Sequence, residues 1–359
     1  MKKFLIFISI IFLFTLNSAS EKTKNFSWLK LNGKISSNWN EMIQTQNSLQ
    51  KEQEKRINKI WNDIISSTRE TWVTYSDDFH ARSIVNFKEG SVKVEAVVEN
   101  EDMGSKVKAK KIIKKKLEKI LNEKDSKQNL IVGDQINLSL QKIKTDEISK
   151  IKIEKINNTK GKYSISLKMV PNHLQIRINK YLPLIEKYCK KFNIEPALAL
   201  GIIHTESYFN PMAYNAKGDA YGLMQIVPRY AGKLMNKVLF NKNLEPTSDQ
   251  LFNPEINIQI GIAYLKHLSE NIWQKVDNLT NRTYCMVCSY NGGAGSVYKA
   301  MTGRMKNIKP NVYENMLSSL STMDSKFLYK KLLNDIPFNE TREYLKNVNK
   351  NYQNYKKII

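Results

Sequence analysis

The stretch Pro196–Ile226, PALALGIIHTESYFNPMAYNAKGDAYGLMQI, decides how the rest of the chain is interpreted. Pro196 suits the first turn of a helix, where its missing N–H would have had no partner. An apolar face follows at three- and four-residue spacing and ends on an acid, in the order Ala199, Ile202, Ile203, Glu206. An ionised carboxylate is costly to bury. Glu206 is therefore either a surface residue at a helix end or a functional acid.

Turn and helix signals follow Glu206 along the second half of the chain. Asn210-Pro211 and the glycines of 218–222 predict turns, and Asn253-Pro254 predicts the start of a helix. The apolar run Thr283–Ser289 ends at a glycine-rich segment, and a last helix is expected near Glu340. This half is expected to be mostly helical, so turns rather than a sheet edge should form its cleft.

The first half of the chain reads differently. Ser83–Glu99 alternates around Lys88-Glu89-Gly90, a hairpin signature, and Val132–Leu140 and Tyr163–Met169 alternate like further strands. A helix is expected within Met42–Ile65, and the tryptophans here are interpreted as packing residues: Trp28, Trp39, Trp61 and Trp72. We therefore predict a small α+β domain over residues 21–170 and a second domain over residues 171–359, with the boundary at Pro171.

A basic amphipathic helix is predicted at Ser105–Leu121. Its apolar residues share one face, and eight lysines and a single acid, Glu118, fill the rest of Ser105–Ile120. The face is either a contact for anionic cell-wall polymer or a membrane surface, or an ordinary solvated surface. The whole chain carries 57 Lys and Arg against 34 Asp and Glu, spread over both halves. An anionic wall polymer or membrane surface is a better partner for an exported protein than nucleic acid, which we exclude.

The amino terminus reads as an export signal. Met1–Ser20 has two lysines, an apolar run from Phe4 to Leu16 and then small residues suited to cleavage. The run is short for a membrane span, although an uncleaved anchor is the alternative. No cysteine lies near this signal, so a lipid-modified amino terminus is not expected. We predict a soluble protein exported to the periplasm.

The three cysteines are interpreted as small buried thiols. Cys285 and Cys288 form a C-x-x-C, but they lie in an apolar helical run, unlike a redox motif, and Cys189 is distant in the sequence. The four histidines do not cluster with them at metal-ligand spacing. No EF-hand loop, P-loop or dinucleotide fingerprint is present. We predict neither a metal nor a cofactor.

Five motifs occur in the order seen in lytic murein transglycosylases. They are Glu206-Ser207, Gly222–Gln225, Asn253-Pro254 with Asn257 and Gly261, Tyr290–Gly293 and Glu340–Tyr344. From Pro171 to about Tyr355 the chain resembles the soluble-lytic-transglycosylase branch of the lysozyme-like fold. Gly218–Gln225, Tyr290–Val297 and the hairpin Arg82–Glu99 are most similar to the membrane-bound C subfamily. Members of that subfamily are typically lipoproteins, and this chain lacks the lipid-accepting cysteine.

The resemblance implies a lysozyme-like catalytic domain and a reaction. Glu206, protonated in an apolar site, would donate a proton to the oxygen that links N-acetylmuramic acid to N-acetylglucosamine in peptidoglycan. The muramyl 6-hydroxyl would then capture the oxocarbenium ion, with Glu206 as base, leaving a 1,6-anhydromuramyl end. No second carboxylate recurs beside Glu206, and the nearest, Asp219, is interpreted as a turn residue.

The resemblance also implies the other site residues. Ser207, Met224 and Gln225 would line saccharide subsites, Tyr290 would hold or polarise the Glu206 carboxyl, and Asn291 would bind substrate. Tyr344 would close the cleft, and aromatic packing is the alternative for both tyrosines. A monomer is expected. The rival functions are a lysozyme-type hydrolase acting with water on the same bond, and a non-catalytic wall-binding protein.

Overall fold

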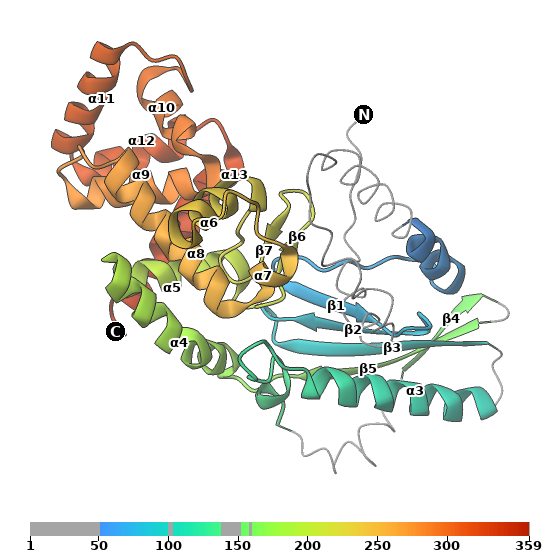
Figure 1. Cartoon of the computed structure of the whole chain (residues 1–359). Helices are drawn as coiled ribbons and strands as arrows, with labels where there is room; N and C mark the ends of the chain where they lie inside the picture. Colours follow the sequence, from blue (N-terminus) through green and yellow to red (C-terminus); the bar gives the residue numbers. More distant parts are fainter. Residues whose placement is uncertain (1–50, 100–102, 138–151, 158–159, 359) are drawn as a thin grey trace, which may run out of the picture. The chain divides into compact units, whose positions relative to one another are not determined.

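The computed structural model describes residues 51–99, 103–137, 152–157 and 160–358 (Figure 1). The predicted leader, Trp28 and Trp39 lie outside these residues. The predicted helix of the region 42–65 is described from residue 51 and is helical over residues 51–60. The chain divides into two compact units. The first contains the residues up to Ile176 together with Ala213–Asp219, and the second contains Arg177–Met212 and the residues from Ala220 onward.

The first unit is built on a five-stranded antiparallel sheet. Its strand order is β1-β2-β3-β5-β4, so that β3 and β5, far apart in the sequence, pair in the middle. The strands are β1 (Thr71–Tyr75), β2 (Ala81–Asn86), β3 (Ser91–Glu99), β4 (Lys152–Asn157) and β5 (Lys160–Lys168); the unit also contains the two-residue strand β6 (Tyr214–Asn215). The hairpin β2–β3 and the strand β5 confirm two of the sequence predictions.

The β2–β3 turn depends on Gly90. Its φ of 59° is in the left-handed region, and a Cβ there would lie 2.6 Å from His173 Nε2. A residue with a side chain would be both strained and crowded at this position. The Asn86 side chain accepts the Glu89 N–H at 2.9 Å and closes the turn. The turn predicted at Lys88-Glu89-Gly90 is therefore confirmed.

Helix α3 (Met103–Asn122) covers one face of this sheet. Its buried side is made of Ala109, Ile113, Leu117, Ile120 and Leu121, as the amphipathic pattern predicts. The opposite face packs against Ile57 and Trp61, which cluster with Val73 and Val97. Trp61 and Trp72 are buried, which confirms that both are packing residues.

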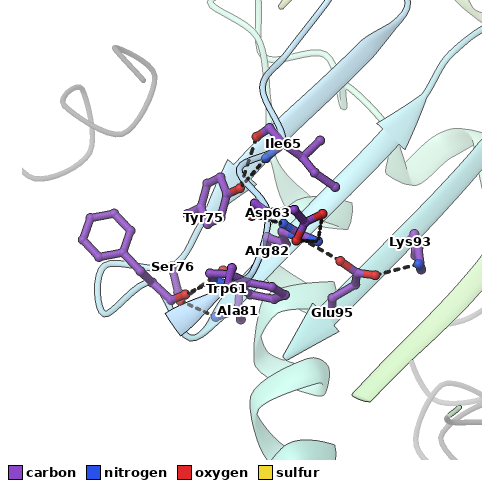
Figure 2. A network of polar contacts seen from close by, with 10 residues as sticks. Trp61, Asp63, Ile65, Tyr75, Ser76, Ala81, Arg82, Lys93 and Glu95 are labelled. Atoms are coloured by element: carbon purple, nitrogen blue, oxygen red, sulfur yellow. Dashed lines mark hydrogen bonds and ion pairs between the residues drawn. The ribbon is translucent and has the colours of Figure 1, made fainter. Parts of the chain in front are cut away.

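A buried ionic network also ties the segment after residue 60 to the sheet (Figure 2). Arg82 and Glu95 are each 1% exposed, and Arg82 Nε donates to Glu95 Oε2 at 2.7 Å. The same guanidinium reaches Asp63 at 3.1 Å and lies 4.0 Å from the Trp61 ring. Lys93 adds a second cation to Glu95 at 2.6 Å. Because both buried charges have partners, the network is tolerated inside the unit.

The predicted strand Val132–Leu140 is wrong over residues 132–137, and its last three residues lie outside the described part. Gly133–Gln135 forms a 3-10 turn, η1, instead. The Gln135 amide is buried and donates to the Ile131 carbonyl at 2.8 Å, while a Cβ on Gly133 would lie 2.0 Å from the Leu121 carbonyl oxygen. Apolar residues do alternate in this segment, but Gly133-Asp134 is also a turn signal, and the segment forms the turn rather than a strand.

The second unit is almost entirely helical. Its elements are α4 (His173–Phe192, which starts within the first unit), α5 (Pro196–Ser207), β7 (Ala220–Tyr221), η4 (Pro228–Gly232), α6 (Lys233–Phe240), α7 (Ser248–Phe252), α8 (Pro254–His267), η5 (Leu268–Ile272), α9 (Leu279–Gly292), α10 (Ala294–Thr302), α11 (Pro310–Thr322), α12 (Ser325–Asp335) and α13 (Asn339–Tyr355). A small sheet in one unit and a mainly helical second unit confirm the predicted α+β class.

Helix α5 is the core of this unit. Nine of its twelve residues are buried, and α13 packs against it. Gly201 permits the approach, because a Cβ there would lie 3.0 Å from the Tyr352 backbone nitrogen. Asn351 donates to Thr205 Oγ1 at 3.1 Å across the same contact. Glu206, near the end of α5, is therefore carried by the most enclosed helix of the unit.

The cysteines are all reduced and buried, as predicted. Burial raises the pKa of Cys189 to about 12, so its thiol stays protonated. Among the described residues, no group of His, Cys, Asp and Glu is arranged to hold a metal ion. Within the same residues, no helix is both long and apolar enough to span a bilayer.

Candidate active site

Glu206 lies one residue before the end of α5 and is 5% exposed. The helix ends because Tyr208 and Phe209 both adopt left-handed backbone conformations, with φ of 52° and 58°. Tyr208 N–H closes the end by donating to the His204 carbonyl at 3.1 Å. Among the described residues of the second unit, Glu206 is the only buried carboxylate. Two consecutive strained residues beside one buried acid are typical of a functional site.

The loop Gly222–Gln225 is the second part of the site. Tyr221 and Ile226 exchange two backbone hydrogen bonds at its base, of 3.0 and 3.1 Å. Gly222 has a φ of 74° and Gln225 a φ of 50°. The Gln225 side chain, which is buried, donates to the Gly222 carbonyl at 3.0 Å and braces the loop from inside.

Asn257 of α8 fixes this loop. Its Oδ1 accepts the Met224 N–H, and its Nδ2 donates to the carbonyls of Tyr221 and Leu251, each at 2.8 Å. The side chain is completely buried. Asn253 caps α8 by accepting the N–H groups of the next helical residues, which confirms the helix start predicted from Asn253-Pro254. The capped helix therefore presents Asn257 to the loop.

Two further contacts connect the loop to its surroundings. Ser207 Oγ hydrogen-bonds to the Leu223 carbonyl at 2.7 Å, which joins the end of α5 to the loop. Gly261 of α8 lies directly under Met224, since a Cβ there would come within 2.2 Å of the Met224 sulfur. Ser207 and Met224 are both fully buried, and their side chains contact other residues of the protein. The predicted contact of both residues with saccharide stays a prediction.

Tyr290 of α9 completes the group around Glu206. Its hydroxyl donates to the Met224 carbonyl at 2.8 Å, and its ring lies 5.6 Å from that of Tyr264. Burial, together with the negative charge of Glu206 and the neighbouring Tyr264, raises the pKa of Tyr290 well above its usual value. Tyr290 is therefore a neutral hydroxyl within the electrostatic reach of Glu206.

Asn291 and Tyr344 are the last two predicted site residues in the sequence. Asn291 Oδ1 accepts the Thr341 hydroxyl at 2.7 Å, and Asn291 lines a hollow of about 520 Å³ with Gly292 and the segment Pro337–Thr341. Glu206 is not among the residues that line it. Tyr344 is buried in α13. The predicted closing of a cleft by Tyr344 stays a prediction.

The structure thus places Glu206, Ser207, Met224, Gln225 and Tyr290 in one connected group. Asp219 belongs to the short segment that groups with the first unit. Sequence reasoning gave no role to three residues that contact the predicted site residues, namely Asn257, Tyr264 and Thr341. Asn257 and Thr341 stand inside quoted motifs, which was the available signal for them. For Tyr264 the sequence offered no signal other than its place on a helix face.

Comparisons with known proteins identify the family of the chain. Residues 183–312 match the family model of the transglycosylase SLT domain, and residues 30–134 match that of the membrane-bound lytic murein transglycosylase C N-terminal domain. Membrane-bound lytic murein transglycosylase C of Pectobacterium atrosepticum is 31% identical over 84% of this chain and 87% of its own length. The chain belongs to this transglycosylase C family. The resemblance predicted from the five motifs is therefore confirmed.

Other members of the family are similar over the same length. The transglycosylase C of Serratia proteamaculans is 30% identical over 84% of this chain and 87% of its own. Among solved structures, the 70 kDa soluble lytic transglycosylase SLT70 of Escherichia coli is 28% identical over 52% of this chain, with a TM-score of 0.37. The match spans 26% of that chain.

Proposed function

We propose that this member of the family is a peptidoglycan lytic transglycosylase in which Glu206 is the general acid and then the base. The observation that carries the proposal is the position of Glu206. It is the only buried carboxylate among the described residues of the second unit, and it adjoins the loop fixed by Asn257 and Tyr290. We propose residues 171–359 as the catalytic domain and residues 21–170 as the accompanying α+β domain.

The proposed reaction requires Glu206 to be protonated before it begins. Burial penalises the negative charge, and the last turn of a helix has a partial negative charge of its own. The proton of the Tyr290 hydroxyl is directed at the Met224 carbonyl. Toward Glu206 the Tyr290 oxygen can therefore only accept a hydrogen bond, which suits a protonated carboxyl. Tyr290 was predicted to hold or polarise the carboxyl, and we propose that it does so by accepting the proton of Glu206 in a hydrogen bond.

The reaction then needs one carboxyl group. Protonated Glu206 donates to the glycosidic oxygen between N-acetylmuramic acid and N-acetylglucosamine, and the bond to the muramyl C1 breaks. The ionised Glu206 next removes the proton of the muramyl 6-hydroxyl as its oxygen bonds to C1, which gives the 1,6-anhydro ring. Glu206 ends protonated again and no water is consumed. Most glycosidases use two carboxylates, but here the substrate supplies the nucleophile.

The proposed setting follows from the leader and the family. Met1–Ser20 would export the chain to the periplasm, where glycan strands are the substrate. Gln225 and Asn291 are the proposed polar contacts for saccharide. The relatives are named membrane-bound proteins, and we propose that this chain also works at a membrane surface.

Digestion of purified sacculi, followed by mass analysis of the muropeptides, tests the proposal. The expected products carry anhydro ends, which are one water lighter than reducing ends. Glu206→Gln should abolish their release, while Glu186→Gln, a matched change at an exposed acid of α4, should leave it unchanged. Reducing ends would instead indicate a lysozyme-type hydrolase. If Glu206→Gln cleared peptidoglycan as fast as the parent, Glu206 would not be the catalytic acid.

A further inference from the structure

The helical segment η4–α6 exposes a regular pair of stripes. The residues at its surface recur every four positions as a basic residue followed by an apolar one: Arg229-Tyr230, Lys233-Leu234 and Lys237-Val238. Tyr230 is 66%, Leu234 37% and Val238 63% exposed. Residues four apart in the α-helix α6 lie on one side of it, and Arg229 and Tyr230 precede them in the π-helical turn η4. The exposed apolar residues (Tyr230, Leu234, Val238) thus form a stripe beside the basic residues (Arg229, Lys233, Lys237).

The stripes are held by the buried side of the same segment. Gly232, Met235 and Asn236 are buried, and Asn236 donates to the Leu244 carbonyl at 2.8 Å, which fixes the turn after α6. Arg229 lies over the Tyr230 ring at 5.1 Å. The exposure of the two stripes is therefore a property of a packed helix, not of a loose end.

The charge of this segment has one sign. From Pro228 to Leu244 the sequence contains four basic residues and no acid. Among the described residues, no acid pairs with Arg229, Lys233 or Lys237 within salt-bridge distance, and the first acid along the chain is Glu245. The surface thus offers three aligned cations beside three aligned apolar side chains, with its charge still available to a partner.

We propose that the η4–α6 face docks this protein on an anionic lipid bilayer. Aligned apolar side chains can enter the headgroup region while adjacent Lys and Arg side chains bind anionic headgroups. A hydrophilic glycan polymer would satisfy the basic stripe but would leave the leucine and valine in water. A second copy is disfavoured, because both partners would bring three cations to the same contact.

The inference does not depend on the catalytic proposal, and the experiment keeps the two apart. The chain from Glu21 onward, which retains every described residue and lacks the apolar leader, is sedimented with vesicles of phosphatidylglycerol and phosphatidylethanolamine or of phosphatidylcholine alone. We expect binding to the anionic vesicles only. Glu206→Gln should bind them as the parent does, whatever its activity.

Two double variants test the stripes separately. Leu234→Asn with Val238→Asn should weaken binding about tenfold, since two side chains lose their partial burial. Lys233→Gln with Lys237→Gln should weaken it about fivefold for each charge removed, and added salt should reduce this difference. Phe327→Asn, which removes an exposed aromatic residue from α12, is the matched control and should bind like the parent. Far-UV circular dichroism confirms that each variant is folded.

Three outcomes would overturn the inference. The first is that the parent does not bind anionic vesicles, or that both double variants bind as it does. The second is that the double variants lose affinity for purified sacculi and not for vesicles, which would make the occupant a wall polymer. The third is that vesicle binding is lost only when exposed lysines of α3 are neutralised, as in Lys106→Gln with Lys111→Gln and Lys115→Gln. That result would move the membrane contact to α3.

Discussion

Replacement of Gly261 by alanine should test the packing that fixes the loop beside Glu206. In an exposed helix the change would stabilise, by about 1 kcal/mol, because alanine has the higher helix propensity. Here a Cβ would lie 2.2 Å from the Met224 sulfur, 2.8 Å from its Cε and 2.9 Å from its Cβ. Carbon atoms in contact are normally about 3.5–4.0 Å apart. The added methyl group has no room.

The magnitude depends on what can move. The Met224 sulfur and Cε can rotate away, because methionine is flexible. Its Cβ cannot, because the backbone is held by the hydrogen bonds of Met224 N–H to Asn257 and of Tyr290 to the Met224 carbonyl, each 2.8 Å long. Overpacking typically costs about 1–3 kcal/mol, and the helix propensity gain offsets about 1 kcal/mol of it. We expect Gly261→Ala to lower the free energy of unfolding by up to about 2 kcal/mol and to reduce release of anhydromuropeptides.

Urea unfolding followed by far-UV circular dichroism, which reports mainly on the helical second unit, measures the effect. Met224→Ala provides a double-variant cycle, since it removes the two closest atoms. The double variant should be more stable than the sum of the single effects predicts, by about 1 kcal/mol. If the two effects simply added, Met224 would not pack on α8 as described.

Three further predictions concern buried titratable groups, each followed by the free energy of unfolding. Burial, and after it the charges of Arg177 and Lys350, lowers the pKa of His204 from 6.5 to about 4, so the unfolded chain binds more protons than the folded one between these pH values. The free energy of unfolding should therefore fall by about 1 kcal/mol from pH 7.5 to 5.5, and His204→Gln should remove this pH dependence. Burial, and after it the charge of Lys119, lowers the pKa of Lys116 to about 7, so the free energy of unfolding should rise from pH 7 toward 10.5. The variant Lys116→Met should be about 2 kcal/mol more stable than the parent at pH 7 and should not show this rise. Glu95→Gln should cost about 3 kcal/mol, since it leaves the buried Arg82 without its closest carboxylate; an unchanged unfolding midpoint would contradict this.

Much of the fold could be predicted because local signals mark it. Pro196 at the first turn of α5, and the Asn253 cap of α8, act on their own helix ends and need no distant partner. The same is true of the α3 pattern and of the β2–β3 turn. The segment 132–137 was the exception, because its short alternation and its Gly-Asp turn signal pointed in different directions.

The supports of the site could not be predicted in this way. Asn257 meets residues 33 and 36 positions away, and nothing within its own helix marks it as a partner of the loop. The contact of Gly261 with Met224 likewise exists only after α8 and the loop have packed together. Family motifs drew attention to these residues, but their function in positioning the loop is a three-dimensional property.

Glu95 shows why burial alone does not make an acid catalytic. It is even less exposed than Glu206. Burial acts to raise the pKa of Glu95, but the hydrogen bonds and charges of Lys93 and Arg82 outweigh it and hold the pKa below its usual value. A carboxylate held ionised in this way has no proton to donate near neutral pH. Glu206 instead lies at the negative end of a helix, beside a tyrosine whose proton is directed elsewhere. The cations beside Glu95 make it a structural anion, whereas the helix end and the Tyr290 hydroxyl support the proposed role of Glu206 as a proton donor.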